Sequence, residues 1–234
     1  MNLPLIAIDG PAGVGKSTTA RAVALRLGIP FLDTGALYRA VTYAVMKNGI
    51  SATDVAAVKR LLEKVKLTII PGDKEQQVWL DDENVTQFLR SPEVTQKVSE
   101  VCEIHEVRIF LVDMQRNWAR RGFGVVEGRD IGTVVFPKAG LKIFMTANPD
   151  IRAFRRGKDL GISEDSQALS TLSKELARRD KRDSERADSP LRQAADAMLI
   201  DTSDMTLDEQ INAILRIIGE RFSMKLFQAV PYVD

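Results

Sequence analysis

Residues 10–17, near the start of the chain, fit the pattern G-x-x-x-x-G-K-[ST]. The aliphatic run over residues 3–8 has the length of a buried strand, and residues 18–27 have the pattern of a helix that Gly28 ends. A phosphate-binding loop requires this strand-loop-helix context, because its glycines let backbone N–H groups turn inward around a polyphosphate at the helix N-terminus. A glycine-rich turn that fits by chance is the alternative. The motif predicts a nucleotide site, but it does not indicate a reaction.

The loop also predicts which of its residues contact the ligand. We expect Lys16 to reach the β- and γ-phosphates and the Ser17 hydroxyl to ligate Mg²⁺. The residues expected to bind the nucleotide are Gly10, Pro11, Ala12, Gly13, Val14, Gly15, Lys16, Ser17 and Thr18.

Composition limits the remaining function classes. The chain has 234 residues, enough for one sizeable α/β core with a smaller inserted lobe. Lys and Arg number 33 against 32 Asp and Glu, so no global positive field attracts nucleic acid or a membrane. One cysteine (Cys102) excludes an internal disulfide, and one histidine (His105) cannot build a His/Cys metal site. No stretch has the roughly 20 apolar residues of a membrane span, and we expect a soluble, cytoplasmic protein.

Four further apolar stretches have the character of strands, and helical patterns separate most of them. They are residues 29–32, 125–126, 141–145 and 197–202. Asn148 and Pro149 have the residue types that open a helix, and residues 206–209 form a capping box for a closing helix to about Phe222. The sequence therefore predicts an α/β fold with a parallel sheet of about five strands flanked by helices.

Residues 51–90 interrupt this alternation. A helical pattern over residues 55–65 precedes strand-like residues 66–70 and 77–80, which bracket a turn at Pro71-Gly72-Asp73, and residues 82–85 continue the hairpin. Helix returns over residues 92–118. We interpret the antiparallel segment as an insertion packed on one edge of the core.

Charged residues follow two of the predicted strands, at the edge where α/β sheets bind ligands. Asp33 or Thr34 can cap the next helix, and Arg39 lies one turn into it, either to hold a phosphate or as a solvated arginine. Glu127, Arg129 and Asp130 stand among glycines after residues 125–126, where a solvated charged loop is the alternative.

Two arginine-rich segments follow. Arg152, Arg155 and Arg156 precede a loop that begins near Gly157, which suits a lid that closes over phosphates. The helix over residues 169–186 alternates arginines with acids, and such a helix is as often a solvated, salt-bridged face.

With these residues in view, the chain resembles the bacterial cytidylate kinases, a family of nucleoside-monophosphate kinases, over nearly its whole length. The resemblance rests on residues 8–17, 32–39, 127–137 and 178–186. It implies transfer of the γ-phosphoryl group of ATP-Mg to CMP or dCMP, by a monomer that binds neither nucleic acid nor membrane. It implies a single kinase domain with its core at residues 1–35, 120–152 and 165–222, a monophosphate-binding lobe at about 36–118, a lid at about 153–164 and a tail at 223–234.

The resemblance also implies roles, position by position. Thr34, Arg39 and Arg129 match residues that grip the acceptor phosphate; Ser99, Arg108 and Asp130 match those around the cytosine; Arg179 and Asp183 match those near the ribose, with Arg186 completing the group and Tyr38 among the substrate contacts. Lys16, Arg129, Arg152 and Arg156 are the expected catalytic residues. Thr34 replaces a frequent Ser, and Glu127 stands where Asp is common, which leaves its role toward Mg²⁺ open.

Two rival functions remain. A P-loop kinase for another small acceptor, such as another nucleotide or a hydroxylated acid, shares most of these features. A nucleotide-dependent switch or nucleic-acid-binding module would use its arginines on a phosphate backbone, but near-neutral net charge and a lack of interleaved aromatic residues argue against it.

Overall fold

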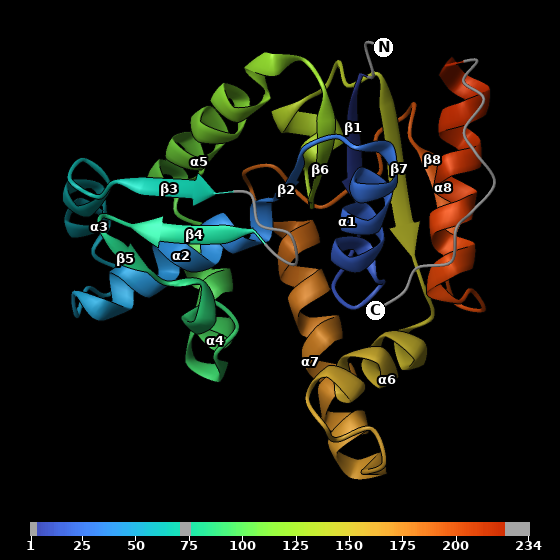
Figure 1. The fold of residues 1–234 in the computed structure, drawn as a ribbon. Helices are drawn as coiled ribbons and strands as arrows, with labels where there is room; N and C mark the ends of the chain where they lie inside the picture. The colour runs from blue at the N-terminus through green and yellow to red at the C-terminus, as the bar shows by residue number, and fades with distance from the viewer. Residues whose placement is uncertain (1–3, 71–75, 223–234) are drawn as a thin grey trace. The chain divides into compact units, whose positions relative to one another are not determined.

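The structure is a computed structural model that describes residues 4–70 and 76–222 (Figure 1). The predicted turn at Pro71-Gly72-Asp73 and the tail from residue 223 lie outside these residues. The chain divides into two units, which we call the sheet unit (Met1–Phe31 and Gly122–Asp234) and the inserted unit (Leu32–Arg121).

The main sheet has five parallel strands, as the sequence predicts, in the order β2-β6-β1-β7-β8. These strands are β2 (Phe31–Asp33), β6 (Gly124–Gly128), β1 (Leu5–Asp9), β7 (Leu141–Thr146) and β8 (Met198–Asp201). In the central strand, Ile8 pairs with Glu127 on one side and with Ile143 on the other. Ile6 and Ile8 are fully buried, as expected for a strand covered on both faces. Glu127 is therefore held in the sheet, next to the central strand.

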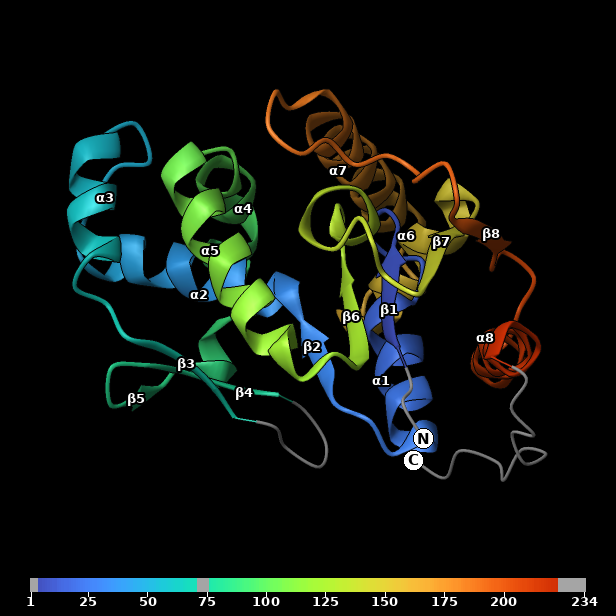
Figure 2. The same ribbon diagram turned by 90° about the horizontal axis from the view of Figure 1, so that it is seen from above.

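Helices cover this sheet on both faces (Figure 2). They are α1 (Lys16–Leu27), α6 (Pro149–Asp159), α7 (Ser166–Glu185) and α8 (Leu207–Phe222), with the short helical segment η3 (Ile131–Val135). The segment η2 (Ala119–Arg121) belongs to the inserted unit. Helix α1 packs against α8 and β6, and α6 packs against α7. Ile211, Ile214 and Ile218 of α8 are fully buried in the main core.

Local capping chemistry sets several helix ends where the sequence predicts them. Gly28 ends α1 with φ 62°, and Asn148 caps α6 with Pro149 at its start. At the start of α8, the Thr206 N–H and hydroxyl each donate to Glu209 Oε2 at 2.8 Å, and the Glu209 N–H donates to the Thr206 hydroxyl oxygen. These side chains satisfy backbone groups that a helix end leaves unpaired, so local sequence suffices to place them.

Helix α6 continues past the residue at which we expected a loop. Gly157 lies inside the helix, and a Cβ there would stand 2.5 Å from Leu169 Cδ2 of the α7 segment. The glycine therefore permits close packing of α6 on α7, and the prediction of a loop beginning near it is wrong. Only residues 160–165 connect the two helices.

The inserted unit combines helices with a small antiparallel sheet of order β3-β4-β5. Its elements are α2 (Thr34–Lys47), α3 (Val55–Leu62), β3 (Leu67–Ile70), β4 (Gln77–Leu80), β5 (Glu83–Asn84), η1 (Thr86–Phe88), α4 (Pro92–Cys102) and α5 (His105–Trp118). The predicted hairpin strands pair with Leu67 opposite Leu80. The helix expected over residues 92–118 is divided at Ile104, which adopts an extended backbone and buries its side chain.

Among residues 4–70 and 76–222, no helix is both long enough and apolar enough to cross a membrane.

Candidate nucleotide site

The loop between β1 and α1 approaches its neighbours too closely for any residue larger than glycine at its first position. A Cβ on Gly10 would stand 2.2 Å from the Met145 carbonyl oxygen of β7. Gly15 immediately precedes α1 with φ 92°, a left-handed conformation that glycine adopts without strain. The loop residues thus lead into the N-terminus of α1, where backbone N–H groups and the helix dipole favour an anion.

Lys16 is buried, with 5% of its surface exposed, and its Nζ donates to the Pro11 carbonyl oxygen at 2.8 Å. Burial and the positive charge of Arg129 together lower the pKa of Lys16 to about 7, although Glu127 and Asp9 oppose the change. A polyphosphate beside the ammonium would favour its charged form. The lysine is therefore poised to gain a proton when an anion binds.

Ser17 and Glu127 form an oxygen-rich pair next to Lys16. The Ser17 hydroxyl donates to Glu127 Oε1 at 2.5 Å. A hydroxyl, a carboxylate and ligand phosphates are donors that suit Mg²⁺, which commonly takes only one or two carboxylates from a protein. Within the described part of the chain, no cluster of three or more His, Cys, Asp and Glu could hold a metal alone. The donor set fits a Mg²⁺ ion that arrives with a phosphate ligand.

Asp9, at the end of β1, is a site residue to which sequence analysis assigned no role. Its carboxylate accepts from the N–H groups of Ile131 at 2.8 Å and Gly132 at 2.7 Å. Burial raises the pKa of Asp9 to about 6, although these two hydrogen bonds oppose the rise. Asp9 thereby fixes the start of η3, directly after Arg129 and Asp130. The sequence signal that could have identified Asp9 is a single carboxylate at the end of the apolar strand β1.

Four of the predicted substrate residues meet in one charged network of the sheet unit. Arg129 Nε donates to Asp183 Oδ2 at 3.0 Å, and Arg186 lies 3.9 Å from Asp183 and 3.7 Å from Asp130. Burial alone would lower the pKa of Arg129, but Asp183 and Glu127 raise it above its ordinary value. Arg179, on the same helix as Asp183, is close enough to Lys16 to lower its pKa. Arginine side chains from two distant segments of the chain therefore lie in one charged network.

Helix α7 therefore has two different charged faces. The side chains of Asp183 and Arg186 are only 11% and 6% exposed, whereas those of Lys181 and Glu185 are 72% and 67% exposed. One face of this arginine-rich helix is thus solvated and salt-bridged, as one interpretation predicts, and the other is buried in the network around Arg129.

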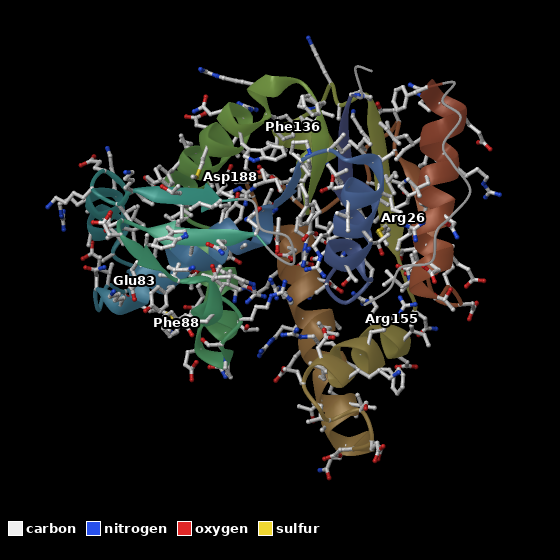
Figure 3. All side chains as sticks on the ribbon, in the orientation of Figure 1. Arg26, Glu83, Phe88, Phe136, Arg155 and Asp188 are labelled. Carbon is white, nitrogen blue, oxygen red and sulfur yellow. The ribbon has the colours of Figure 1, made fainter. Side chains whose placement is uncertain are left out.

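The three arginines of α6 differ in their contacts. Arg155 is the labelled arginine of α6 in Figure 3. It donates to the Thr202 hydroxyl at 3.0 Å and to the carbonyl oxygens of Thr202 and Met205, which holds the loop before α8. Arg152 is buried against the phosphate-binding loop. The Arg156 side chain is 24% exposed and lies 3.6 Å from Asp159. Of the three, Arg156 is held only by a local, largely solvated ion pair among the contacts observed.

The other predicted substrate residues belong to the inserted unit. Thr34 and Tyr38 are buried on α2, and the Arg108 guanidinium lies over the Tyr38 ring, 5.5 Å from its centre. Arg39 donates to the Leu89 carbonyl at 3.2 Å and to the Thr95 hydroxyl at 2.9 Å. Arg39 is thus not merely a solvated surface arginine. Asp33 caps α2 by accepting from the Ala36 N–H at 3.1 Å.

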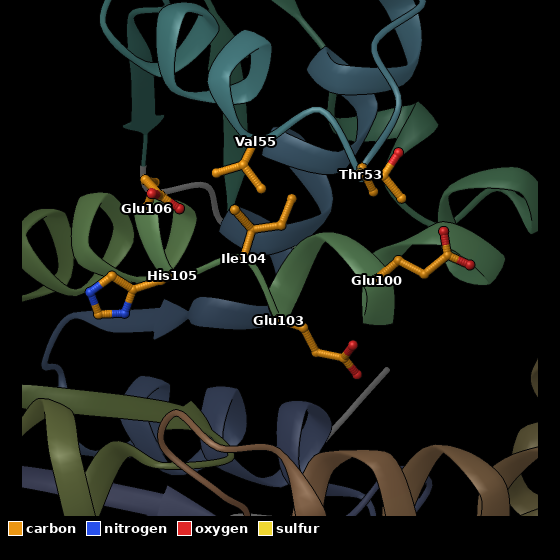
Figure 4. Close-up of a pocket in the computed structure, with 8 residues that line it drawn as sticks. Thr53, Val55, Glu100, Glu103, Ile104, His105 and Glu106 are labelled. Atoms are coloured by element: carbon orange, nitrogen blue, oxygen red, sulfur yellow. The ribbon is translucent and has the colours of Figure 1, made fainter.

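Ser99 lies half-buried on α4 of the same unit. A separate surface hollow of about 480 Å³ occurs on this unit around Ile104 and His105 (Figure 4). Glu100, Glu103 and Glu106 line it, so its charge opposes binding of a phosphate-bearing ligand.

Comparison with known proteins agrees with this arrangement. The family described as "Cytidylate kinase" matches residues 6–220. A cytidylate kinase of Carboxydothermus hydrogenoformans is 45% identical over 92% of this chain and 97% of its own length. Those of Ligilactobacillus salivarius and an Exiguobacterium strain are 48% and 47% identical, each over 92% of this chain and 96% of the relative. The chain belongs to the cytidylate kinase family.

Proposed function

We propose that this protein transfers the γ-phosphoryl group of ATP-Mg to CMP or dCMP, giving CDP or dCDP and ADP. The observation that supports this most is that family membership covers residues 6–220, including both the loop around Lys16 and the Arg129 network. Nucleotide phosphates are the ligands that such a set of buried cations can bind.

The reaction forms a bond between an oxygen of the acceptor phosphate and the γ-phosphorus of ATP. It breaks the bond from that phosphorus to the β,γ-bridging oxygen, which leaves with ADP. Lys16 would hold the β- and γ-phosphates, Arg129 with Thr34 and Arg39 would hold the acceptor phosphate, and Arg156 would neutralise charge as transfer proceeds. No general base is needed, because the acceptor oxygen is already ionised. Ser17, with its neighbour Glu127, would hold Mg²⁺, which would supply positive charge to the phosphate oxygens.

The remaining roles are proposals of the same kind. Arg152 adds positive charge beside the ATP phosphates, and Arg179, Asp183 and Arg186 contact the acceptor ribose. We also propose a monomer that acts in the cytoplasm, where both nucleotides are available. Gel filtration with light scattering tests the monomer, for which a mass of 26.0 kDa is expected.

Binding of ATP should take up close to one proton per site at pH 8. Lys16, whose pKa in the free protein is about 7, is then largely neutral, and the phosphates restore its charge. Affinity should accordingly fall as pH rises from about 7 toward 10. Calorimetry in two buffers of different ionisation enthalpy measures the uptake. Lys16→Arg, which is charged throughout this range, should abolish it; an unchanged uptake in that variant would assign the proton to another group.

Arg156→Ala should lower kcat by about 10- to 100-fold while changing the Kd of CMP by less than about threefold. Among the described residues, Arg156 forms an ion pair with Asp159 of its own helix, whose side chain is 66% exposed, so loss of the pair costs little stability and the arginine charge is available to the transition state. Asp159→Asn, which removes the partner but not the arginine, is the control and should keep near-normal kcat. A collapse of CMP affinity with intact kcat would place Arg156 at the acceptor.

The proposed reaction has a direct test in its stoichiometry. Incubation of ATP, CMP and Mg²⁺ with the protein should produce ADP and CDP in equal amounts by ion-exchange chromatography, and EDTA should stop both. Formation of ADP without CDP would instead indicate hydrolysis and a nucleotide-dependent switch.

A further inference from the structure

Both backbone polar groups of Ala12, in the phosphate-binding loop, are bound by side chains from α6 and α7. The Ala12 N–H donates to Asp180 Oδ1 at 3.3 Å, and its carbonyl oxygen accepts from Arg152 Nη1 at 3.1 Å. Arg152 Nη1 also forms an ion pair with Asp180 Oδ2. The two side chains are only 8% and 18% exposed, so solvent screens the pair weakly. Loop, α6 and α7 are thus closed into one ring of polar contacts.

Apolar packing holds the same point of the loop. Ala12 packs against a small cluster formed by Ala153, Leu172 and Leu176. At the next residue, a Cβ on Gly13 would stand 3.0 Å from the Arg152 carbonyl oxygen and 3.1 Å from its Cβ. Because the backbone of α6 abuts the loop this closely, a displacement of Arg152 must also displace the loop.

The charges of the pair have different consequences for an incoming polyphosphate. The Asp180 carboxylate accepts from the N–H of Ala12, in a loop expected to bind anions. At this position a carboxylate that no cation neutralises would repel phosphate. Arg152 supplies that neutralisation. Asp180, in turn, fixes the guanidinium against Ala12. Asp180 is therefore compatible with phosphate binding only when Arg152 is present, and Arg152 is held against the loop only when Asp180 is present.

We propose that Asp180 is a positioning residue for ATP: through Arg152 and Ala12 it holds the phosphate-binding loop in register with α6 and α7. This inference rests on the proposed function, because ATP is the ligand whose affinity it controls. Asp180 is not a catalytic residue, since it acts through Arg152 and the loop backbone. Its removal should affect the donor nucleotide and not CMP.

Asp180→Asn keeps the size of the side chain and an oxygen for the Ala12 N–H, but it removes the charge. We expect the Kd of ATP, measured by calorimetry without CMP, to rise about 10-fold, and Asp180→Ala to raise it further, as loss of a charge-assisted contact predicts. The KM of CMP should change less than about twofold. Glu185→Gln removes an exposed acid from the same helix and should leave all of these values unchanged.

The decisive comparison repeats the substitution without the arginine. Arg152→Ala leaves the Asp180 carboxylate unpaired beside the phosphates, so it should weaken ATP binding more than Asp180→Asn does. In that background, Asp180→Asn should improve ATP binding, the reverse of its effect in the wild type. A structural role alone would not reverse sign. In an Arg152→Lys background, which keeps the positive charge beside the carboxylate, Asp180→Asn should not improve ATP binding.

Three results would overturn the inference: equal ATP affinity in Asp180→Asn and wild type, equal losses for ATP and CMP, or a lower melting temperature with unchanged ATP affinity. If Asp180→Asn does not fold, Asp180→Ser is used instead: it should improve ATP binding in the Arg152→Ala background and not in the Arg152→Lys background. A wild-type protein that binds no ATP would overturn the proposed function itself, which distinguishes the two failures.

Discussion

Lys16→Met is expected to lower kcat by at least about 10²- to 10³-fold while the protein stays folded. Loss of one preorganised positive group at a developing charge has an effect of this size. Lys16 is buried and its ammonium is disfavoured there, as its lowered pKa of about 7 shows, so an apolar side chain of similar length should be tolerated. The substitution removes the bond to the Pro11 carbonyl oxygen, which is 2.8 Å long.

Initial rates at saturating ATP and CMP, together with thermal melts, check this prediction. Lys181→Met is the matched control, because Lys181 is a lysine on α7 whose side chain is 72% exposed, and it should behave as the wild type. A folded Lys16→Met protein with near-normal turnover would show that the loop does not hold the reacting phosphates.

Asp130→Ala should reduce kcat/KM for CMP about 10- to 200-fold and leave the low value for UMP nearly unchanged. A carboxylate accepts from the exocyclic amine of cytosine, whereas it would face the corresponding carbonyl of uracil acceptor to acceptor. Asp130 is 4% exposed, so an unmatched group there is not rescued by solvent. Arg108, if it donates to the cytosine ring nitrogen, discriminates in the same sense, because uracil carries an N–H at that position.

Asp130→Asn distinguishes recognition of the base by residue 130 from a purely structural role of that residue. Its amide can donate to the uracil carbonyl, so kcat/KM for UMP should rise above that of the alanine variant. Asp130 also lies 3.7 Å from Arg186. In the variants, Arg186 retains its ion pair with Asp183 at 3.9 Å, so it should stay in place. Measurements with CMP, UMP and AMP on each protein, with melts, decide the matter. Equal losses on CMP and UMP would make Asp130 a structural residue.

Local sequence predicted much of the fold because the relevant interactions are local. The loop glycines, the Asn148-Pro149 helix start and the Thr206 capping box each satisfy backbone groups within a few residues. The short helix at residues 131–135 was not predicted, because it depends on Asp9, more than 120 residues away in the chain. Long-range hydrogen bonds leave no pattern in the residues around either partner.

The arginines show the same limit at the site. Their clustering predicted a phosphate site, but sequence alone could not distinguish Arg155, which supports the loop before α8, from Arg156, which pairs with Asp159 of its own helix. The pairing of Arg152 with Asp180 likewise joins two helices through Ala12 and appears only in the folded chain. Residue type shows that each side chain is positively charged, whereas only the tertiary structure shows which arginines already bind other groups of the protein.

The most direct test of the account is kcat/KM of the wild-type protein with ATP-Mg and a panel of acceptors: CMP, dCMP, UMP, AMP and shikimate as a hydroxylated acid. We predict that CMP and dCMP exceed UMP by at least about 10-fold, the cost of one mismatched buried polar group, and that AMP and shikimate are poorer still. A value for UMP, AMP or shikimate equal to or above that for CMP would contradict the account.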